Sequence, residues 1–220
     1  QFIQADFIDL DRIVTISKFR SSMGHDFSSG GETCRSMKHY FTPQYTAEDL
    51  KYYEGGAHPP PPDPATAISI YSPIDGTIVD IAGEQIDIGK QLYIRSKRYP
   101  KYTVRLFHIY PLSGIAKGVT VTAGQKIGQI SKSQGTDIAV QSGGFGRGAK
   151  FVSYFSLMPD VIFAKYQARG VSTRDDFIIT KEYRDAHPLE CNGEQFAKPY
   201  ESDPNYNEVV RLSGYVEPRY

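Results

Sequence analysis

Short apolar runs separated by polar and glycine positions fill the middle of the chain, between residues 68 and 141. The runs near Gly118, Gly124 and Gly128 are about five residues long, which is a common strand length and too short for helices. Asp75-Gly76 lies between two apolar-rich runs, and glycine accepts the positive φ of a two-residue turn, so this pair predicts a hairpin. The pattern predicts a mainly β (α+β) protein with an antiparallel core over residues 68–141.

The residues before this core have a different pattern. Residues 1–54 predict a strand at about 13–19, then a Gly/Ser-rich loop, then a short helix from about residue 46, with Thr46 as its N-cap. Residues 55–67 contain five prolines, which favour an extended conformation and exclude both helix and strand pairing. We therefore expect an N-terminal strand with a site loop, joined to the core by an exposed proline-rich loop.

Short helices and a polar tail are expected after the core, over residues 142–220. Pro159 is suited to a first helical turn and Gly170 to the position after a helix. Thr173 and Asp176 have the spacing of a capping box. Helices this short bury little surface alone, so this part is predicted to pack as a cover on the β core.

Charge and hydropathy argue against nucleic-acid binding and against a membrane span. The 25 basic and 25 acidic residues cancel, and a nucleic-acid binder is expected to have an excess of positive charge. No apolar run approaches the roughly 20 residues that cross a bilayer. We therefore expect neither nucleic-acid binding nor a membrane span.

The first residue and the cysteines fit an exported protein. The chain begins with Gln1 and not with Met, as a processed secreted protein or a trimmed chain would. In an oxidising compartment, a bridge between Cys34 and Cys191 would stabilise the fold by about 4 kcal/mol in the chain-entropy model. Two separate buried thiols are the alternative. A secreted or cell-surface location with a Cys34–Cys191 disulfide is the prediction.

The core also carries motifs that resemble a known family. They are SPIDGTIVDI at residues 72–81, a strand containing His108, and GVTVTAGQKIGQIS at residues 118–131. Their order resembles that of the lysostaphin/LytM-type zinc endopeptidases, over roughly residues 10–141. The resemblance implies an antiparallel β-sheet or sandwich of the duplicated-hybrid-motif type, with the short helices C-terminal to it.

The resemblance also implies a zinc site, which this chain has mostly lost. The family holds zinc with a His, an Asp four residues later and the second His of a His-x-His strand, and leaves a position open for water. Here Ser22 replaces the first ligand and Ala139 the last, while Asp26 matches the aspartate. Of the two histidines that act on water, His108 is kept and Asp137 replaces the other. A zinc site of the family type cannot be built from these positions.

A rearranged site stays open, because imidazole, carboxylate and thiolate side chains gather in one predicted loop, and these are ligands of zinc and other transition metals. The candidate metal ligands are Asp26, His25 and His108. If the protein is active, His108 and Asp137 are the candidate catalytic residues. The candidates for a groove that binds without metal are His25, Asp26, His39 and Arg35.

A retained framework with a dismantled metal set favours a protein that is not an enzyme and needs no cofactor. Such a protein would bind a glycan, peptide or protein partner at the cell surface, or would be a structural subunit there, possibly as a homo-oligomer. The alternative is a zinc-dependent endopeptidase acting on cell-wall or secreted substrates through a rearranged site. In a third interpretation, the core resembles lipoyl-type or phosphocarrier domains by convergence, and His108 accepts a phosphoryl group.

Overall fold

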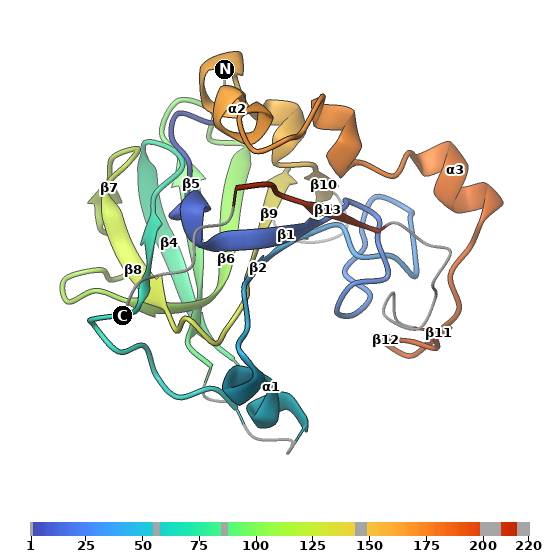
Figure 1. Cartoon of the computed structure of the whole chain (residues 1–220). Coiled ribbons are helices and arrows are strands. Elements are labelled where there is room, and N and C mark those ends of the chain that lie inside the picture. Colours follow the sequence, from blue (N-terminus) through green and yellow to red (C-terminus); the bar gives the residue numbers. More distant parts are fainter. Residues whose placement is uncertain (1, 55–57, 85–87, 144–148, 199–207, 215–220) are drawn as a thin grey trace.

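The fold is mainly antiparallel β-sheet, as predicted (Figure 1). The computed structural model describes residues 2–54, 58–84, 88–143, 149–198 and 208–214. Parts of the predicted proline-rich loop and of the predicted C-terminal cover lie outside these residues.

The strands are β1 (Ile13–Ser17), β2 (His39–Pro43), β3 (Ile68–Tyr71), β4 (Gly76–Gly83), β5 (Lys90–Ser96), β6 (Tyr102–Pro111), β7 (Thr120–Val121), β8 (Lys126–Ile130), β9 (Thr136–Ser142), β10 (Lys150–Val152), β11 (Cys191–Asn192), β12 (Gln195–Phe196) and β13 (Val209–Arg211). The helices are α1 (Ala47–Glu54), α2 (Asp160–Gln167) and α3 (Lys181–Ala186), with 3₁₀ turns at Leu10–Arg12, Phe155–Leu157 and Arg174–Phe177.

One large sheet joins segments from the whole chain. Its order is β13-β1-β2-β9-β6-β5-β4-β7, and β3 is attached through β8 to β6. Strand β6 belongs to both parts, because residues 102–107 pair with β9 whereas Tyr110 and Pro111 pair with β8. His108 lies between these two pairings with a left-handed backbone, at φ 63°. This position sets the direction of its side chain.

The apolar core joins residues of the sheet with residues of the C-terminal segments. Aromatic rings join the two, since Phe7 packs edge-on against Phe41 and Phe155 stacks on Phe177 with ring centroids 3.7 Å apart. Tyr166 of α2 is fully buried against the same group. Figure 1 shows α2 at one end of the sheet, α1 at the opposite end, and α3 with the β11–β12 hairpin to one side.

The predicted helix ends are confirmed. Helix α1 begins directly after Thr46, whose Oγ1 accepts a hydrogen bond from the backbone N–H of Asp49. Thr173 and Asp176 form the predicted capping box, here on a 3₁₀ turn. Gly170 follows α2 with φ 87°, a conformation that glycine adopts at little cost.

The predicted hairpin at Asp75-Gly76 is wrong. Strand β3 pairs with β8, and β4 pairs with β5 and β7, so the strands on either side of this turn do not pair with each other. Glycine is needed at residue 76 for a different reason. A Cβ there would lie 2.5 Å from the carbonyl oxygen of Arg95 on the adjacent strand, which is a clash.

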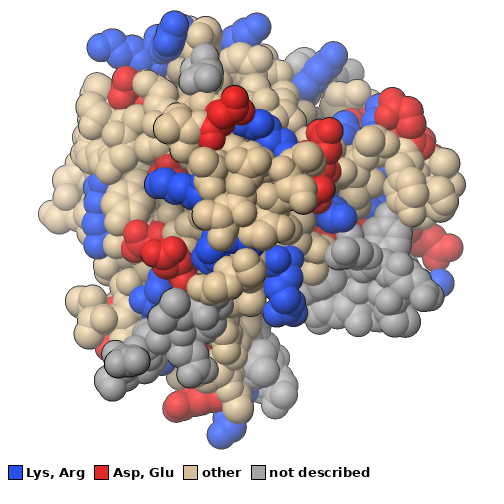
Figure 2. Space-filling model, turned by 45° about the horizontal axis from the view of Figure 1, so that its top comes forward, with Lys and Arg blue, Asp and Glu red and all other residues tan. Residues whose placement is uncertain are grey.

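Charged residues of both signs are interspersed over the face drawn in Figure 2. This distribution agrees with the net charge of zero and gives that face no broad basic field. Among the described helices, none is long and apolar enough to span a bilayer.

Candidate functional site

Three adjacent strands, β6, β9 and β2, bring the site together. Phe107 of β6 lies opposite Asp137 of β9, and Asp137 lies opposite Tyr40 of β2. Neighbouring residues of a strand normally point to opposite faces. The left-handed backbone of His108 breaks this alternation, so its ring reaches the same side as Phe107, and its Nε2 lies 3.1 Å from Asp137 Oδ1.

Lys38 lies at the centre of the site. Its Nζ lies 2.6 Å from Asp137 Oδ2, with the lysine side chain 3% and the aspartate 0% exposed. The same ammonium lies over the rings of Phe107, Phe27 and Tyr40, at 4.3, 4.7 and 5.0 Å from their centroids. Aromatic faces attract cations, most strongly where water is excluded. The ammonium is thus enclosed by one carboxylate and three rings.

A fourth charged group, Glu84, completes a row of alternating charges. Its Oε1 lies 3.3 Å from His108 Nδ1 and accepts a hydrogen bond from the His108 backbone N–H at the same distance. Lys38, Asp137, His108 and Glu84 thus contact one another in sequence. The row is neutral overall when His108 carries a proton.

The contacts within this row fix its protonation. Burial alone would lower the pKa of His108, but Asp137 and Glu84 raise it to about 9. Burial would raise the pKa of Asp137, but Lys38 and His108 bring it well below its usual range. A general base must be unprotonated near the working pH. His108 is protonated at neutral pH, so it is unsuited to deprotonating a water molecule.

The candidate metal ligands Asp26, His25 and His108 are not brought together. One oxygen of the Asp26 carboxylate accepts the backbone N–H of Arg35, and the Asp26 N–H binds Glu194 O. The aspartate is therefore engaged by its own loop and by the β11–β12 turn. Within the described part of the chain, no three His, Cys, Asp or Glu side chains are grouped so as to hold a metal ion.

His39 and Arg35, two of the candidate groove residues, lie elsewhere. His39 is 1% exposed, its Nδ1 and Nε2 contact Ser17 O and Ser153 Oγ, and burial lowers its pKa to about 4. It is a neutral core residue because side chains alternate in direction here, so that Lys38, directly before β2, faces the site and His39, the first residue of β2, faces the core. Arg35 instead pairs with Glu32 and Asp185.

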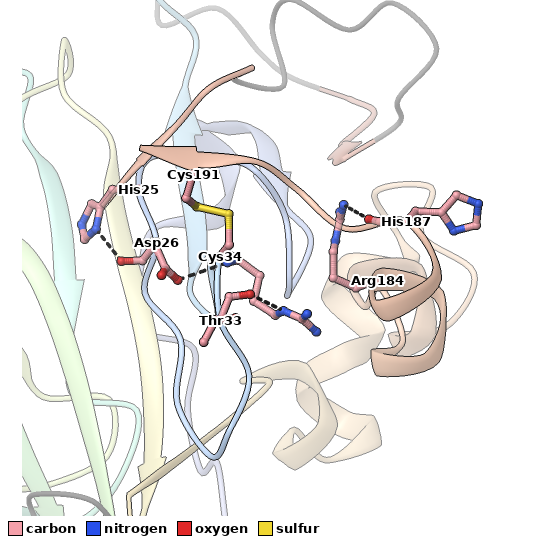
Figure 3. The surroundings of a disulfide bond; sticks show 8 residues. His25, Asp26, Thr33, Cys34, Arg184, His187 and Cys191 are labelled. Atoms are coloured by element: carbon pink, nitrogen blue, oxygen red, sulfur yellow. Dashed lines mark hydrogen bonds between the residues drawn. A yellow bond between two sulfur atoms is a disulfide. The ribbon is translucent and has the colours of Figure 1, made fainter. Parts of the chain in front are cut away.

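The predicted disulfide forms and fastens the loop that carries His25. Cys34 and Cys191 are joined across 157 residues of sequence, and the adjacent hairpin forms a β-bridge between His25 and Gln195. In Figure 3, His25 points toward the strands, whereas the disulfide, Arg184 and His187 lie on the other side of the loop. The bridge therefore supports the site loop from behind.

An open groove of about 270 Å³ begins at His108. Gln134 forms part of its wall, and its Nε2 donates hydrogen bonds to the carbonyls of Ile88 and His108. These bonds leave its buried Oε1 as an acceptor, for which the described residues supply no donor. The groove is lined by Met23, Tyr40, Phe41, Thr42, Tyr45, His58, Pro59, Ile88, His108, Gln134, Gly135 and Thr136.

The residues of this site do not fit the zinc ion that the family resemblance implies. A catalytic zinc needs three protein ligands and an open position. Ala139 offers no donor atom, the Asp26 carboxylate is engaged by Arg35 within its own loop, and the Lys38 ammonium already occupies the free side of Asp137. A divalent cation there would face a buried positive charge.

Sequence reasoning placed His108 and Asp137 correctly beside each other but missed Lys38 and Glu84. The signal for Lys38 was Asp137 itself, because a carboxylate in a buried strand needs a cationic partner. Residue 38 falls in the predicted Gly/Ser-rich loop, for which the sequence predicts no side-chain direction.

No family model and no curated protein sequence matches the chain. Among solved structures, it is similar to lysostaphin in solution, with 13% identity and a TM-score of 0.39 over 64% of this chain and 54% of lysostaphin. A structure of the SpoIIQ–SpoIIIAH pore-forming complex matches with 11% identity and a TM-score of 0.47, over 75% of this chain and 97% of the other. Csd3 of Helicobacter pylori matches with 16% identity and a TM-score of 0.39, over 100% and 47%.

This chain therefore spans about half the length of lysostaphin and of Csd3. The resemblance to the lysostaphin/LytM-type fold that the sequence predicts is found again in these matches. Likeness at this level does not carry chemistry, which follows from the residues of the site.

Proposed function

We propose that the protein is an exported, non-catalytic LytM-like protein that binds a peptide segment of a protein partner in the groove beside His108. The observation that carries this proposal is the pairing of an open groove with a charge row that has neither a metal-ligand set nor an unprotonated histidine, as judged over the described residues. A groove without a metal-ligand set and without such a histidine can still bind a ligand, and binding is the role that we propose for it.

The groove wall favours a peptide. Met23, Tyr45, Pro59 and Ile88 offer mainly apolar surface for a side chain. Thr42, Gln134 and Thr136 add polar residues to this wall. A few placed polar groups within an apolar wall are typical of binding pockets.

Export is supported by the disulfide, since such bonds persist in oxidising compartments. The alternative function, a zinc endopeptidase with a rearranged site, requires a ligand set and a water-activating base. Among the described residues, the row of Lys38, Asp137, His108 and Glu84 offers neither a metal-ligand set nor such a base.

Selection from a displayed library of random peptides tests the proposal. A selected peptide is then synthesised, and its binding is measured by fluorescence anisotropy. Met23→Arg puts a charge into the groove and is expected to weaken binding at least tenfold. Val161→Arg is the matched control, because Val161 lies on α2 outside the groove and is 78% exposed.

Equal binding by both variants would place the peptide elsewhere and contradict the proposal. Zinc-dependent cleavage of the selected peptide by the purified protein would contradict its non-catalytic part. If the protein bound glycans and no peptide, and Met23→Arg weakened that binding to the same extent, the ligand would be a glycan and the proposed peptide would be wrong.

A further inference from the structure

We propose that the ammonium of Lys38 supplies, as a permanent part of the chain, the positive charge that a metal ion supplies in the zinc enzymes that this protein resembles. The inference concerns the charge row and does not depend on what occupies the groove.

The first support is the arrangement around Nζ. Asp137 Oδ2 lies 2.6 Å away, and His25 Nε2 lies 3.5 Å away on the site loop. Asp137 stands where the resemblance expects a histidine that acts on the zinc-bound water, and not a zinc ligand. A carboxylate on the strand and an imidazole on the loop thus converge on one cation, which here is the end of a lysine side chain.

The second support is the orientation of His25. Its Nδ1 lies 2.9 Å from the backbone carbonyl oxygen of Asp26, so this nitrogen carries the hydrogen and donates it. Nε2 is then left with a lone pair, which faces the Lys38 ammonium. Metal-binding histidines are held in the same way, with one N–H donated to a carbonyl and the other nitrogen turned to the cation.

The third support is the charge balance. Without Lys38, the row would keep the carboxylates of Asp137 and Glu84 against the single positive charge of His108. A buried carboxylate without its counter-ion is strongly unfavourable. The site therefore requires a cation at this point, and a covalently attached one cannot be removed by a chelator.

Lys38→Ala tests the inference, because it removes the ammonium and leaves space beside Asp137. We expect its melting temperature to fall by roughly 10 °C, the size expected for breaking a buried ion pair in a domain of this length. Millimolar methylammonium should restore a large part of this loss, and it should leave the melting temperature of the wild type unchanged.

Lys38→Met with Asp137→Asn is the matched control. It removes both charges of the pair, so we expect it to be more stable than Lys38→Ala and indifferent to methylammonium. If Lys38→Ala does not fold, it is refolded with and without methylammonium, and recovery only with the amine supports the inference. Stoichiometric zinc on the wild type would overturn it, as would a Lys38→Ala protein that does not respond to methylammonium.

Discussion

His108 Nε2 and Asp137 Oδ1 lie 3.1 Å apart although the two residues belong to different strands. The contact exists because His108 has a left-handed backbone where β6 changes partner from β9 to β8. A regular strand would have turned the imidazole to the other face. A local departure from strand geometry therefore determines the charge of the site.

The first prediction is that His108 makes the stability depend on alkaline pH. Its folded pKa of about 9 lies above the unfolded value of about 6.5. The resulting stabilisation is fully present below pH 6.5 and is lost as the pH rises to about 9. The loss amounts to at most about 3 kcal/mol.

Urea unfolding at pH 6 and pH 9 measures this effect. In His108→Gln, the free energy of unfolding should be lower at pH 6 and should change less between the two pH values. The same slope in both proteins would show that His108 is not held protonated by Asp137 and Glu84.

The second prediction concerns His39 and has the opposite sign. Its folded pKa of about 4 lies below the unfolded value, because burial favours the neutral ring. Its contribution is present above pH 6.5 and is lost as the pH falls to about 4, by up to about 3 kcal/mol. His39→Gln should flatten the stability profile in this acidic window, and an unchanged profile would contradict the neutral core assignment.

The third prediction is that the disulfide matters both for stability and for the site loop. In the chain-entropy model, closing a loop of this length stabilises by up to about 5 kcal/mol. Replacing both Cys34 and Cys191 by serine should lower the urea midpoint and increase hydrogen exchange at the amide of Asp26, which binds Glu194 O. Unchanged exchange there would mean that the loop is held without the bridge.

The fourth prediction concerns the buried pair of Arg184 and Glu208. Their side chains are 1% and 0% exposed with Nη2 and Oε1 2.6 Å apart, and Glu208 also accepts hydrogen bonds from Ser22. Glu208→Gln removes a buried charge partner and should cost about 3–5 kcal/mol in thermal or urea unfolding.

Asp160→Asn is the matched control for Glu208→Gln. It removes the carboxylate from the Arg174–Asp160 pair, whose aspartate is 97% exposed, and exposed pairs contribute little. Equal losses from both substitutions would contradict the structural role given to Glu208.

The sequence was sufficient for those features that depend on local chemistry. The caps at Thr46 and Thr173, the left-handed Gly170 and the β character of the core all follow from residue types at fixed spacing. The proximity of His108 and Asp137 came from the family resemblance, since it depends on strand order.

The rest of the site depends on register, which residue types do not reveal. Strand β2 begins inside what was expected to be an irregular loop. A shift of one residue exchanges the faces of a strand, and here it decides that Lys38 enters the site while His39 enters the core. Motif spacing also gives no information about the hydrogen bond from Arg35 that orients the Asp26 carboxylate.

The Cys34–Cys191 bond also changes what a protease could do to this molecule. A single cut anywhere between these two residues, including the proline-rich stretch that begins at residue 58, would leave two fragments that remain covalently joined. The sheet and the charge row would stay associated after such a nick. At the extracellular location proposed above, the bond would therefore provide tolerance to backbone damage.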